Sequence, residues 1–425
     1  MIKLTKEVNS VFKELEKNGY DVYAYGRCVR ESMIGIKTLD WDLATSARID
    51  NIKEIFKDAE IIDEKREIAR FVYESENEQV IIDLSPYGTP IVDENIKFYD
   101  NITDQLEKEY FVLDAMADNP NRTFCDPFDA RQDMKAKIVR CTSDPIEIFK
   151  KNPTKMFDAV ELAAELGYDL ENELYEAVKA NVDLISDDSL SYVTRSLERI
   201  VVADHSGVGL NILAETGLLK VIVGPEIFDK MNSTERYDYI GLCEGIDKVK
   251  KVKDRRLGLF YICFSGKRAH AAIDRLDFSE RTNFRLHDGI DNIIKINFLG
   301  SYIEFKHYLA DVGTERYNYL NNLSKAQRIV YDFQDTKIQA RVYYETEIKK
   351  TGEAVFPEDL VIDENDIMEA GYADTKEKAY ELLKLVVDVV HIKPNRNDRQ
   401  ELLKEAKKMS KSKFAVATRR ILWLK

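Results

Sequence analysis

The hydrophobic pattern of the chain changes once, near Cys141, and this change limits the folds that the sequence can adopt. Before it, short runs such as residues 20–25 and 79–84 have strand character and alternate with short helical segments. After it, apolar residues recur at helical spacing to the C-terminus, with one break at residues 351–365. The pattern predicts an α+β fold, in which a small mixed sheet with helices on one side precedes an all-helical remainder.

Composition excludes several classes of protein. None of the 425 residues lies in an apolar stretch of 18 or more, so we expect no transmembrane helix, and the charged start lacks the apolar region of a standard signal peptide. Five scattered cysteines without a CxxC pair argue against a disulfide framework or a cysteine-rich zinc site. They fit a reducing compartment, so we expect a cytoplasmic protein. Only five histidines occur, which disfavours a histidine-rich metal site.

Charge is distributed unevenly along the chain. The net charge is −14, yet residues 391–425 contain eleven Lys or Arg and three Asp or Glu. A basic end on an acidic body indicates a local surface for a polyanion such as RNA, and a solvated helix face is the alternative. The residues that we expect to contact an RNA backbone are Lys411, Lys413, Arg419 and Arg420.

Residues 23–47 carry the pattern that points to chemistry. A strand ends at Tyr25, Gly26 allows a tight turn, and a helix follows, which presents backbone N–H groups and a positive helix end to a phosphate. Fourteen residues after Gly26 come Asp40 and Asp42. Residues i and i+2 of a strand share a face, so these carboxylates converge and could share Mg²⁺. A pair of idle strand-edge aspartates is the alternative interpretation.

A third carboxylate often completes such a site. Asp83, in the apolar run QVIIDLS, is the best candidate. Two metal ions about 3.5–4 Å apart suit an in-line phosphoryl displacement. We therefore expect Asp40, Asp42 and Asp83 to be catalytic, with Asp40 and Asp42 as the ligands of two Mg²⁺ ions.

Several segments resemble the class II tRNA nucleotidyltransferase and bacterial poly(A) polymerase family, within the polymerase β superfamily. The family motifs G-G-x-V-R-D-x-L-L-G and D-x-D-L-A-T correspond to residues 26–35 and 40–45. The segments AMADNP (115–120), DPFDARQDMKAKIVR (126–140) and LDFSERT (276–282) are similar to later family segments. The resemblance runs in order along essentially the whole chain.

The resemblance implies a polymerase β-like nucleotidyltransferase head followed by a helical neck, body and tail. The expected boundaries are 1–140 for the head, 141–205 for the neck, 206–345 for the body and 346–425 for the basic tail. It also implies that body and tail hold a tRNA.

The chain departs from the family where the nucleotide is read. Arg27 replaces the second glycine of the first motif, R-R-D-F-T-I-N-A-M-A reads KEYFVLDAMA at residues 108–117, and E-D-P-x-R-x-L-R reads KNPTKMFD at residues 151–158. Asn152 and Lys155 take the positions of the family's base-reading Asp and Arg. Lysine lacks the planar fork that makes two hydrogen bonds to a base edge.

The resemblance implies which residues bind the nucleotide. The Gly26 turn, Arg27 and Arg30 are expected to face the triphosphate, although Arg30 could instead form a structural ion pair with Asp133 or Glu31. The remaining positions are expected to line the nucleotide pocket; they are Lys108, Asn152 and Lys155.

The function that the sequence predicts is metal-dependent addition of nucleotides to an RNA 3′ end, with tRNA as acceptor and CCA or A as product. The expected partners are RNA and nucleoside triphosphates, for a monomer or homodimer. Retained Asp40 and Asp42 favour activity, because an idle carboxylate pair repels itself. A weakly active or inactive RNA-binding paralogue remains an alternative, as does the same chemistry on another acceptor. Base specificity stays open.

Overall fold

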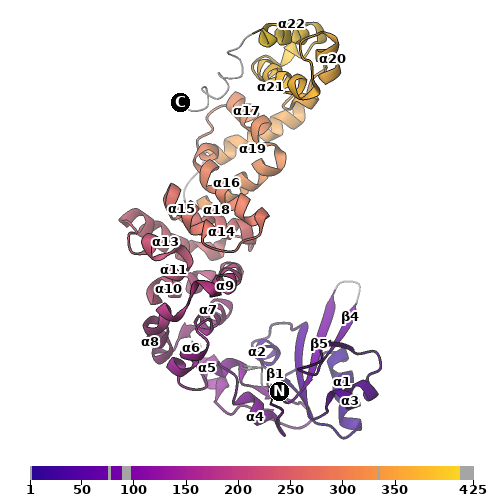
Figure 1. Cartoon of the computed structure of the whole chain (residues 1–425), viewed down its shortest axis with the longest axis vertical. Coiled ribbons are helices and arrows are strands. Elements are labelled where there is room, and N and C mark those ends of the chain that lie inside the picture. Colours follow the sequence, from indigo (N-terminus) through magenta and orange to yellow (C-terminus); the bar gives the residue numbers. More distant parts are fainter. Residues whose placement is uncertain (1, 75–77, 89–96, 333–335, 412–425) are drawn as a thin grey trace. The chain divides into compact units, whose positions relative to one another are not determined.

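The computed structural model describes residues 2–74, 78–88, 97–332 and 336–411. It contains two compact units (Figure 1). One unit comprises Met1–Met231 with Arg275–Asp277, and the other comprises Asn232–Asp274 with Phe278–Lys425. The predicted α+β fold is confirmed, since the sheet lies in the first unit and the second is helical.

A seven-stranded mixed sheet forms the N-terminal part of the first unit. The pairing of β2 with β5 is parallel, and the other neighbouring strands pair antiparallel. The short strands β3, β6 and β7 were not expected from the sequence. In sheet order the strands are β3 (Glu60–Asp63), β4 (Ile68–Glu74), β5 (Gln79–Pro86), β2 (Asp40–Thr45), β1 (Val22–Tyr25), β6 (Ala117–Asp118) and β7 (Phe124–Cys125).

Helices cover both faces of this sheet. The helices α1 (Lys6–Lys17), α2 (Arg27–Met33) and α3 (Ile49–Ile55) share one core with Val22 and Ala24 of β1. Tyr23 points the other way, because successive strand side chains alternate, and it packs with α4 (Ile102–Leu106). The expected arrangement, with helices on one side only, is therefore wrong for α4.

Helices continue the first unit after the sheet. The helix α7 begins at Lys155, directly after its N-cap Thr154 and two residues after Pro153. Gly167 ends α7 in the left-handed region, with φ 68°, as its position predicts. The helices are α5 (Ala130–Ala136), α6 (Pro145–Lys151), α7 (Lys155–Leu166), α8 (Asn172–Asn181), α9 (Leu190–Val202), α10 (Ser206–Thr216), α11 (Leu218–Val223) and α12 (Pro225–Phe228).

Helices are the regular elements of the described residues in the second unit. The long helix α16 follows the N-cap Ser279, whose side chain accepts a hydrogen bond from the N–H of Thr282. The expected break at 351–365 holds only the short 3-10 turn Pro357–Asp359 and the start of α20. The helices are α13 (Ser233–Gly245), α14 (Lys253–Ile262), α15 (Gly266–Asp274), α16 (Glu280–Asn297), α17 (Tyr302–Val312), α18 (Thr314–Tyr331), α19 (Thr336–Thr351), α20 (Glu364–Glu369), α21 (Lys376–Ile392) and α22 (Arg399–Ser410). Within the described ranges, no helix combines the length and apolarity needed to cross a membrane.

Candidate active site

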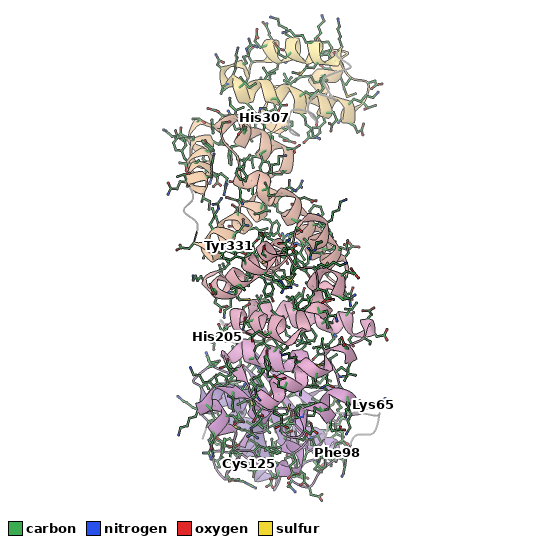
Figure 2. The ribbon with its side chains drawn as sticks, turned by 90° about the vertical axis from the view of Figure 1, so that its left-hand side faces the viewer. Lys65, Phe98, Cys125, His205, His307 and Tyr331 are labelled. Atoms are coloured by element: carbon green, nitrogen blue, oxygen red, sulfur yellow. The ribbon has the colours of Figure 1, made fainter. Side chains whose placement is uncertain are left out.

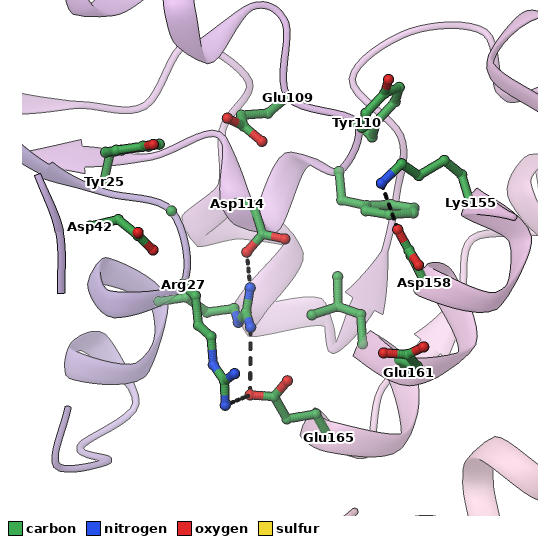
Figure 3. Close-up of a pocket in the computed structure, with 14 residues that line it drawn as sticks. Tyr25, Arg27, Asp42, Glu109, Tyr110, Asp114, Lys155, Asp158, Glu161 and Glu165 are labelled. Carbon is green, nitrogen blue, oxygen red and sulfur yellow. Dashed lines mark hydrogen bonds and ion pairs between the residues drawn. The ribbon is translucent and has the colours of Figure 1, made fainter. Parts of the chain in front are cut away.

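A cavity of about 400 Å³ opens in the first unit beside the C-terminal end of β1 (Figure 3). Its walls come from the β1–α2 turn, from residues 109–114 and from one face of α7. Residues distant in sequence therefore meet there. The lining residues are Tyr25, Gly26, Arg27, Arg30, Asp42, Glu109, Tyr110, Phe111, Asp114, Lys155, Asp158, Glu161, Leu162 and Glu165.

The turn between β1 and α2 requires a glycine. Gly26 has φ 69° and ψ −136°, a conformation that side chains disfavour, and it stands directly before the first residue of α2. Its N–H donates to the carbonyl of Met116 at 2.9 Å, which fixes the turn to the neighbouring β6 segment. The backbone therefore passes along the cavity wall, as the sequence predicts.

Asp40 and Asp42 lie on the exposed face of β2. Both are exposed, whereas Trp41 and Leu43 between and beyond them are buried, so the expected alternation of a strand is confirmed. Neither carboxylate accepts a hydrogen bond or forms an ion pair with another described residue. Crowding by protein atoms, and then the negative charges of Asp40 and Asp83, raise the pKa of Asp42 to about 6. The site thus concentrates negative charge that a cation would relieve.

Asp83 stands next to Asp42 but has a partner of its own. The parallel register of β2 and β5 sets Asp42 opposite Asp83. Arg70 on β4 donates through Nε and Nη2 to the two carboxylate oxygens of Asp83, each at 2.7 Å. Asp83 would therefore have to give up an arginine contact to bind a metal ion. Among the described residues, the three aspartates do not form a cluster with all ligand atoms within 4.8 Å of one another.

The two arginines of the first motif lie in different environments. Arg27 has a side chain that is 63% exposed, and it pairs with Glu31 at 2.7 Å and with Glu165 at 3.4 Å. Arg30 is buried, and its guanidinium pairs with Asp114 and, at 3.5 Å, with Glu165. The ion pairs with Asp133 or Glu31 that were the alternative for Arg30 do not form. Asp133 pairs with Arg140 instead.

Lys155 and Asn152 both contact Tyr110. The ammonium of Lys155 lies 4.6 Å from the centre of the Tyr110 ring and 2.7 Å from Asp158. The amide of Asn152 donates to the Tyr110 hydroxyl at 3.2 Å. Asp158 also accepts a hydrogen bond from the Tyr192 hydroxyl. Lys155 therefore lines the cavity as expected, whereas Asn152 reaches it through Tyr110.

Residue 109, and not residue 108, faces the cavity. Lys108, which was expected in the nucleotide pocket, is exposed and is not among the residues that line the cavity. A tight turn follows α4, with hydrogen bonds from the N–H groups of Lys108 and Glu109, and it directs Glu109 inward. Burial raises the pKa of Glu109 to about 7, against the lowering effect of Lys155. The charge of this wall therefore changes near neutral pH.

The acidic face of α7 was not expected from the sequence. Asp158, Glu161 and Glu165 recur at spacings of three and four residues, so they share one side of the helix and line the cavity. The opposite residues of α7 are apolar and buried. Acidic positions at helical spacing in an otherwise apolar helix were the signal in the sequence that pointed to this wall.

The predicted RNA contacts at the C-terminus lie mostly outside the described residues. Lys411 is exposed directly after α22. Lys413, Arg419 and Arg420 fall in residues 412–425, which the structure does not describe.

Part of the chain matches a known protein family and its relatives. Residues 22–140 match the family model of the poly A polymerase head domain. The CCA-adding enzyme of Geobacillus stearothermophilus is 26% identical over 224 residues, which cover 52% of this chain and 55% of that protein. The CC-adding tRNA nucleotidyltransferase of Halalkalibacterium halodurans is 28% identical over 224 residues, 53% of this chain and 56% of that protein. The chain thus matches about half the length of these relatives.

Solved structures of other proteins have a similar fold over nearly the whole chain. The Bacillus stearothermophilus CCA-adding enzyme in complex with CTP matches with a TM-score of 0.74 at 17% identity, over 94% of this chain and 95% of that one. The Thermotoga maritima CCA-adding enzyme complexed with tRNA matches with a TM-score of 0.64 at 16% identity, over 95% of each chain. At these identities the likeness is one of fold. Residues 22–140 thus match a poly A polymerase head domain, and the resemblance of the chain to the class II tRNA nucleotidyltransferase and poly(A) polymerase family is confirmed.

Proposed function

We propose that this chain is a metal-dependent nucleotidyltransferase that adds nucleotides to the 3′ end of RNA, with tRNA as the acceptor. The observation that carries the proposal is the pair Asp40 and Asp42, exposed on one face of β2 beside a cavity that the Gly26 turn borders. Relatives with CCA-adding or CC-adding tRNA nucleotidyltransferase activity in their names support the reaction and the acceptor.

The donor set of this site fits a hard divalent cation. Carboxylate oxygens are the ligands that Mg²⁺ prefers, and burial, followed by the negative charges of Asp40 and Asp83, raises the pKa of Asp42. Asp40 and Asp42 would hold the cations, and Asp83 would join them if Arg70 released it. When bound there, Mg²⁺ supplies the positive charge that lowers the pKa of an RNA 3′-hydroxyl and offsets the charge of the triphosphate.

The chain's own residues would position the nucleotide. The backbone of the Gly26 turn can approach the phosphates closely because it has no side chain. Arg27 is exposed beside that turn, and it can exchange its contacts with Glu31 and Glu165 for a phosphate. Arg30 stays buried and holds Asp114 and Glu165 in place.

The opposite wall would meet the base. Lys155 sits against Tyr110 and Asp158, so it presents a single ammonium where the family has an arginine fork. Asn152 orients the Tyr110 hydroxyl. We propose that this wall binds a nucleotide with a base preference that differs from that of relatives carrying the family motif.

A second candidate function rests on the charge of the cavity. Its described lining includes six carboxylates, which are Asp42, Glu109, Asp114, Asp158, Glu161 and Glu165. Only three cationic side chains face them, namely Arg27, Arg30 and Lys155. An excess of negative charge opposes a triphosphate. This observation favours a weakly active or inactive paralogue that binds RNA without extending it.

One experiment separates the two candidates. Each labelled nucleoside triphosphate is incubated with Mg²⁺ and a tRNA that lacks its 3′ end, using the wild type, Asp40→Ala/Asp42→Ala and the matched control Asp58→Ala, an exposed acid that does not line the cavity. Incorporation by the wild type and Asp58→Ala, lost in the double variant, supports the transferase. Tight tRNA binding without incorporation supports the paralogue. Consumption of nucleotide without RNA indicates another acceptor.

A further inference from the structure

Three side chains with metal-ligating atoms converge in the second unit, within the helical part of the chain. His307 lies on α17, and Asp388 and His391 lie on α21. Figure 2 shows His307 near the last helices of this unit. The three ligand atoms all lie within 4.8 Å of one another. Such a cluster of two imidazoles and one carboxylate is a common set of protein ligands for transition metals.

The fold brings these residues together from distant parts of the sequence. Asp388 and His391 are three residues apart, so they share one face of α21. The helix α17 packs against α21, and it contributes His307 from 84 positions upstream of His391. His391 is in the last turn of α21, where the helix dipole favours positive charge.

The distances among the three atoms suit one bound ion. Oδ1 of Asp388 lies 2.8 Å from Nδ1 of His307 and 3.8 Å from Nδ1 of His391, and the two Nδ1 atoms are 3.2 Å apart. Metal–ligand bonds of about 2.0–2.2 Å in a tetrahedral site place neighbouring ligand atoms about 3.3 Å apart. The observed distances lie on both sides of this value, so small side-chain movements would complete the coordination.

The surroundings of His391 direct a lone pair into the cluster. Its Nε2 lies 2.9 Å from the carbonyl oxygen of Val355, an acceptor, so Nε2 carries the proton and donates it. The other ring nitrogen, Nδ1, is then an acceptor that faces His307. A metal-bound histidine typically donates its second N–H to a carbonyl or carboxylate in this way.

From this geometry we propose that His307, Asp388 and His391 form a binding site for a divalent transition metal ion such as Zn²⁺. The side chains of His307 and Asp388 are 16% and 24% exposed, so solvent reaches the edge of the cluster. The bound ion would link α17 to α21. The nearby ammonium of Lys306 opposes a cation, but Glu353 pairs with it at 2.6 Å and offsets its charge.

Without a metal, the same atoms form a hydrogen-bonded group. A proton on Nδ1 of His307 can be donated to Asp388 and shared with Nδ1 of His391. Binding of the ion replaces that proton, so proton release accompanies it. The experiment therefore has to distinguish a metal site from a hydrogen-bonded network of the same residues.

Cobalt provides a direct readout. Co²⁺ bound by imidazoles and a carboxylate at low coordination number absorbs visible light, whereas hydrated Co²⁺ is pale. Full-length protein without a polyhistidine tag, carrying Asp40→Ala/Asp42→Ala to remove the head carboxylates, is titrated with Co²⁺ and then with Zn²⁺ in competition. The ligand variants are His307→Gln and Asp388→Asn; His391 is left intact because its side chain is fully buried.

A second histidine pair provides the matched control. The Nδ1 atoms of His270 and His287 face each other, whereas Asp291 lies 2.9 Å from the other ring nitrogen of His270, Nε2. Among the described residues, these atoms do not form a cluster of three ligands. We expect one Co²⁺ per chain, displaced by Zn²⁺, in the parent and in His270→Gln, and binding at least about 10-fold weaker in His307→Gln and Asp388→Asn.

Thermal unfolding separates loss of the site from loss of the fold. Zn²⁺ should raise the unfolding midpoint of the parent and of His270→Gln, because it binds the native state, and should not raise that of Asp388→Asn. All variants should show the parent's circular dichroism without metal. The proposal is overturned if folded parent protein gives no visible band, or if His307→Gln and Asp388→Asn bind Co²⁺ as tightly as the parent. In either case the cluster is a hydrogen-bonded network only.

Discussion

Asp42 and Asp83 are direct partners in the parallel pairing of β2 and β5, yet Arg70 holds both oxygens of Asp83. Arg70 thus neutralises the charge of Asp83, while Asp42 and Asp40 lack charged partners among the described residues. In this account Arg70 competes with the metal for Asp83.

Arg70 is therefore expected to control how much Mg²⁺ the reaction needs. Substitution Arg70→Gln frees Asp83, so the Mg²⁺ concentration for half-maximal incorporation should fall by about 3-fold to 10-fold, given the strength of charged hydrogen bonds. Asp83→Asn should raise it. Arg48→Gln, which breaks the ion pair with Glu67 elsewhere in the head, is the control and should change nothing. A higher Mg²⁺ requirement in Arg70→Gln would show that Asp83 does not serve as a ligand.

The raised pKa of Asp42 makes stability depend on pH. Because the folded pKa of about 6 lies above the unfolded value of 3.8, the native state binds the proton more tightly. The contribution of protonated Asp42 to the free energy of unfolding is therefore present at low pH and is lost as pH rises through about 6. We expect urea unfolding in the presence of EDTA to show that the unfolding free energy of Asp42→Asn rises by about 1 kcal/mol relative to the wild type between pH 4.5 and 7. The change is this small because solvent screens this exposed group. An unchanged difference across that range would contradict the electrostatic account.

Lys155 is expected to act on nucleotide binding. Lys155→Ala removes the contacts with Tyr110 and Asp158 and leaves negative charge on the wall. The KM for nucleoside triphosphate should rise about 10-fold, the equivalent of one charge-assisted contact, with a smaller change in kcat. Lys150→Ala removes an ion pair with Glu147 on α6 and is the control. Equal KM values for the two variants would show that the nucleotide base does not bind at Lys155.

We expect substitution of Arg30 to affect mainly stability and substitution of Arg27 to affect mainly triphosphate binding. Arg30→Met breaks a buried ion-pair group and should cost about 2–3 kcal/mol of unfolding free energy, less than a fully buried pair because Asp114 and Glu165 are partly exposed. Arg27→Met, at an exposed position, should cost less than about 1 kcal/mol and should weaken triphosphate binding. Chemical denaturation and nucleotide titration of both variants check this. The opposite order of stability effects would contradict these roles.

Local pattern predicted much of the fold. The period of two residues in a strand placed Asp40 and Asp42 on one face of β2, and the glycine turn was found from residue type alone. The strands β6 and β7, of two residues each, leave no periodic signal, so they were missed. The helix α16 continues through Gly289, which is buried within it, so this glycine does not end the helix.

Contacts between distant segments could not be predicted. Arg70 reaches Asp83 across a strand pair, and Glu109 replaces Lys108 at the cavity because of the turn after α4. His307 and His391 are 84 residues apart, and no spacing rule joins them. In each case tertiary packing selects the partner, and a single sequence does not record it.

The most direct test of the central claim is transfer of a labelled nucleotide from its triphosphate to the 3′ end of a truncated tRNA, with Mg²⁺ and with Asp42→Asn as the only change. The account predicts incorporation by the wild type and a loss of at least about 100-fold in the variant, because a metal carboxylate contributes several kcal/mol to such a reaction. Incorporation of similar rate in both proteins, or none by folded wild type with any of the four triphosphates, would contradict it.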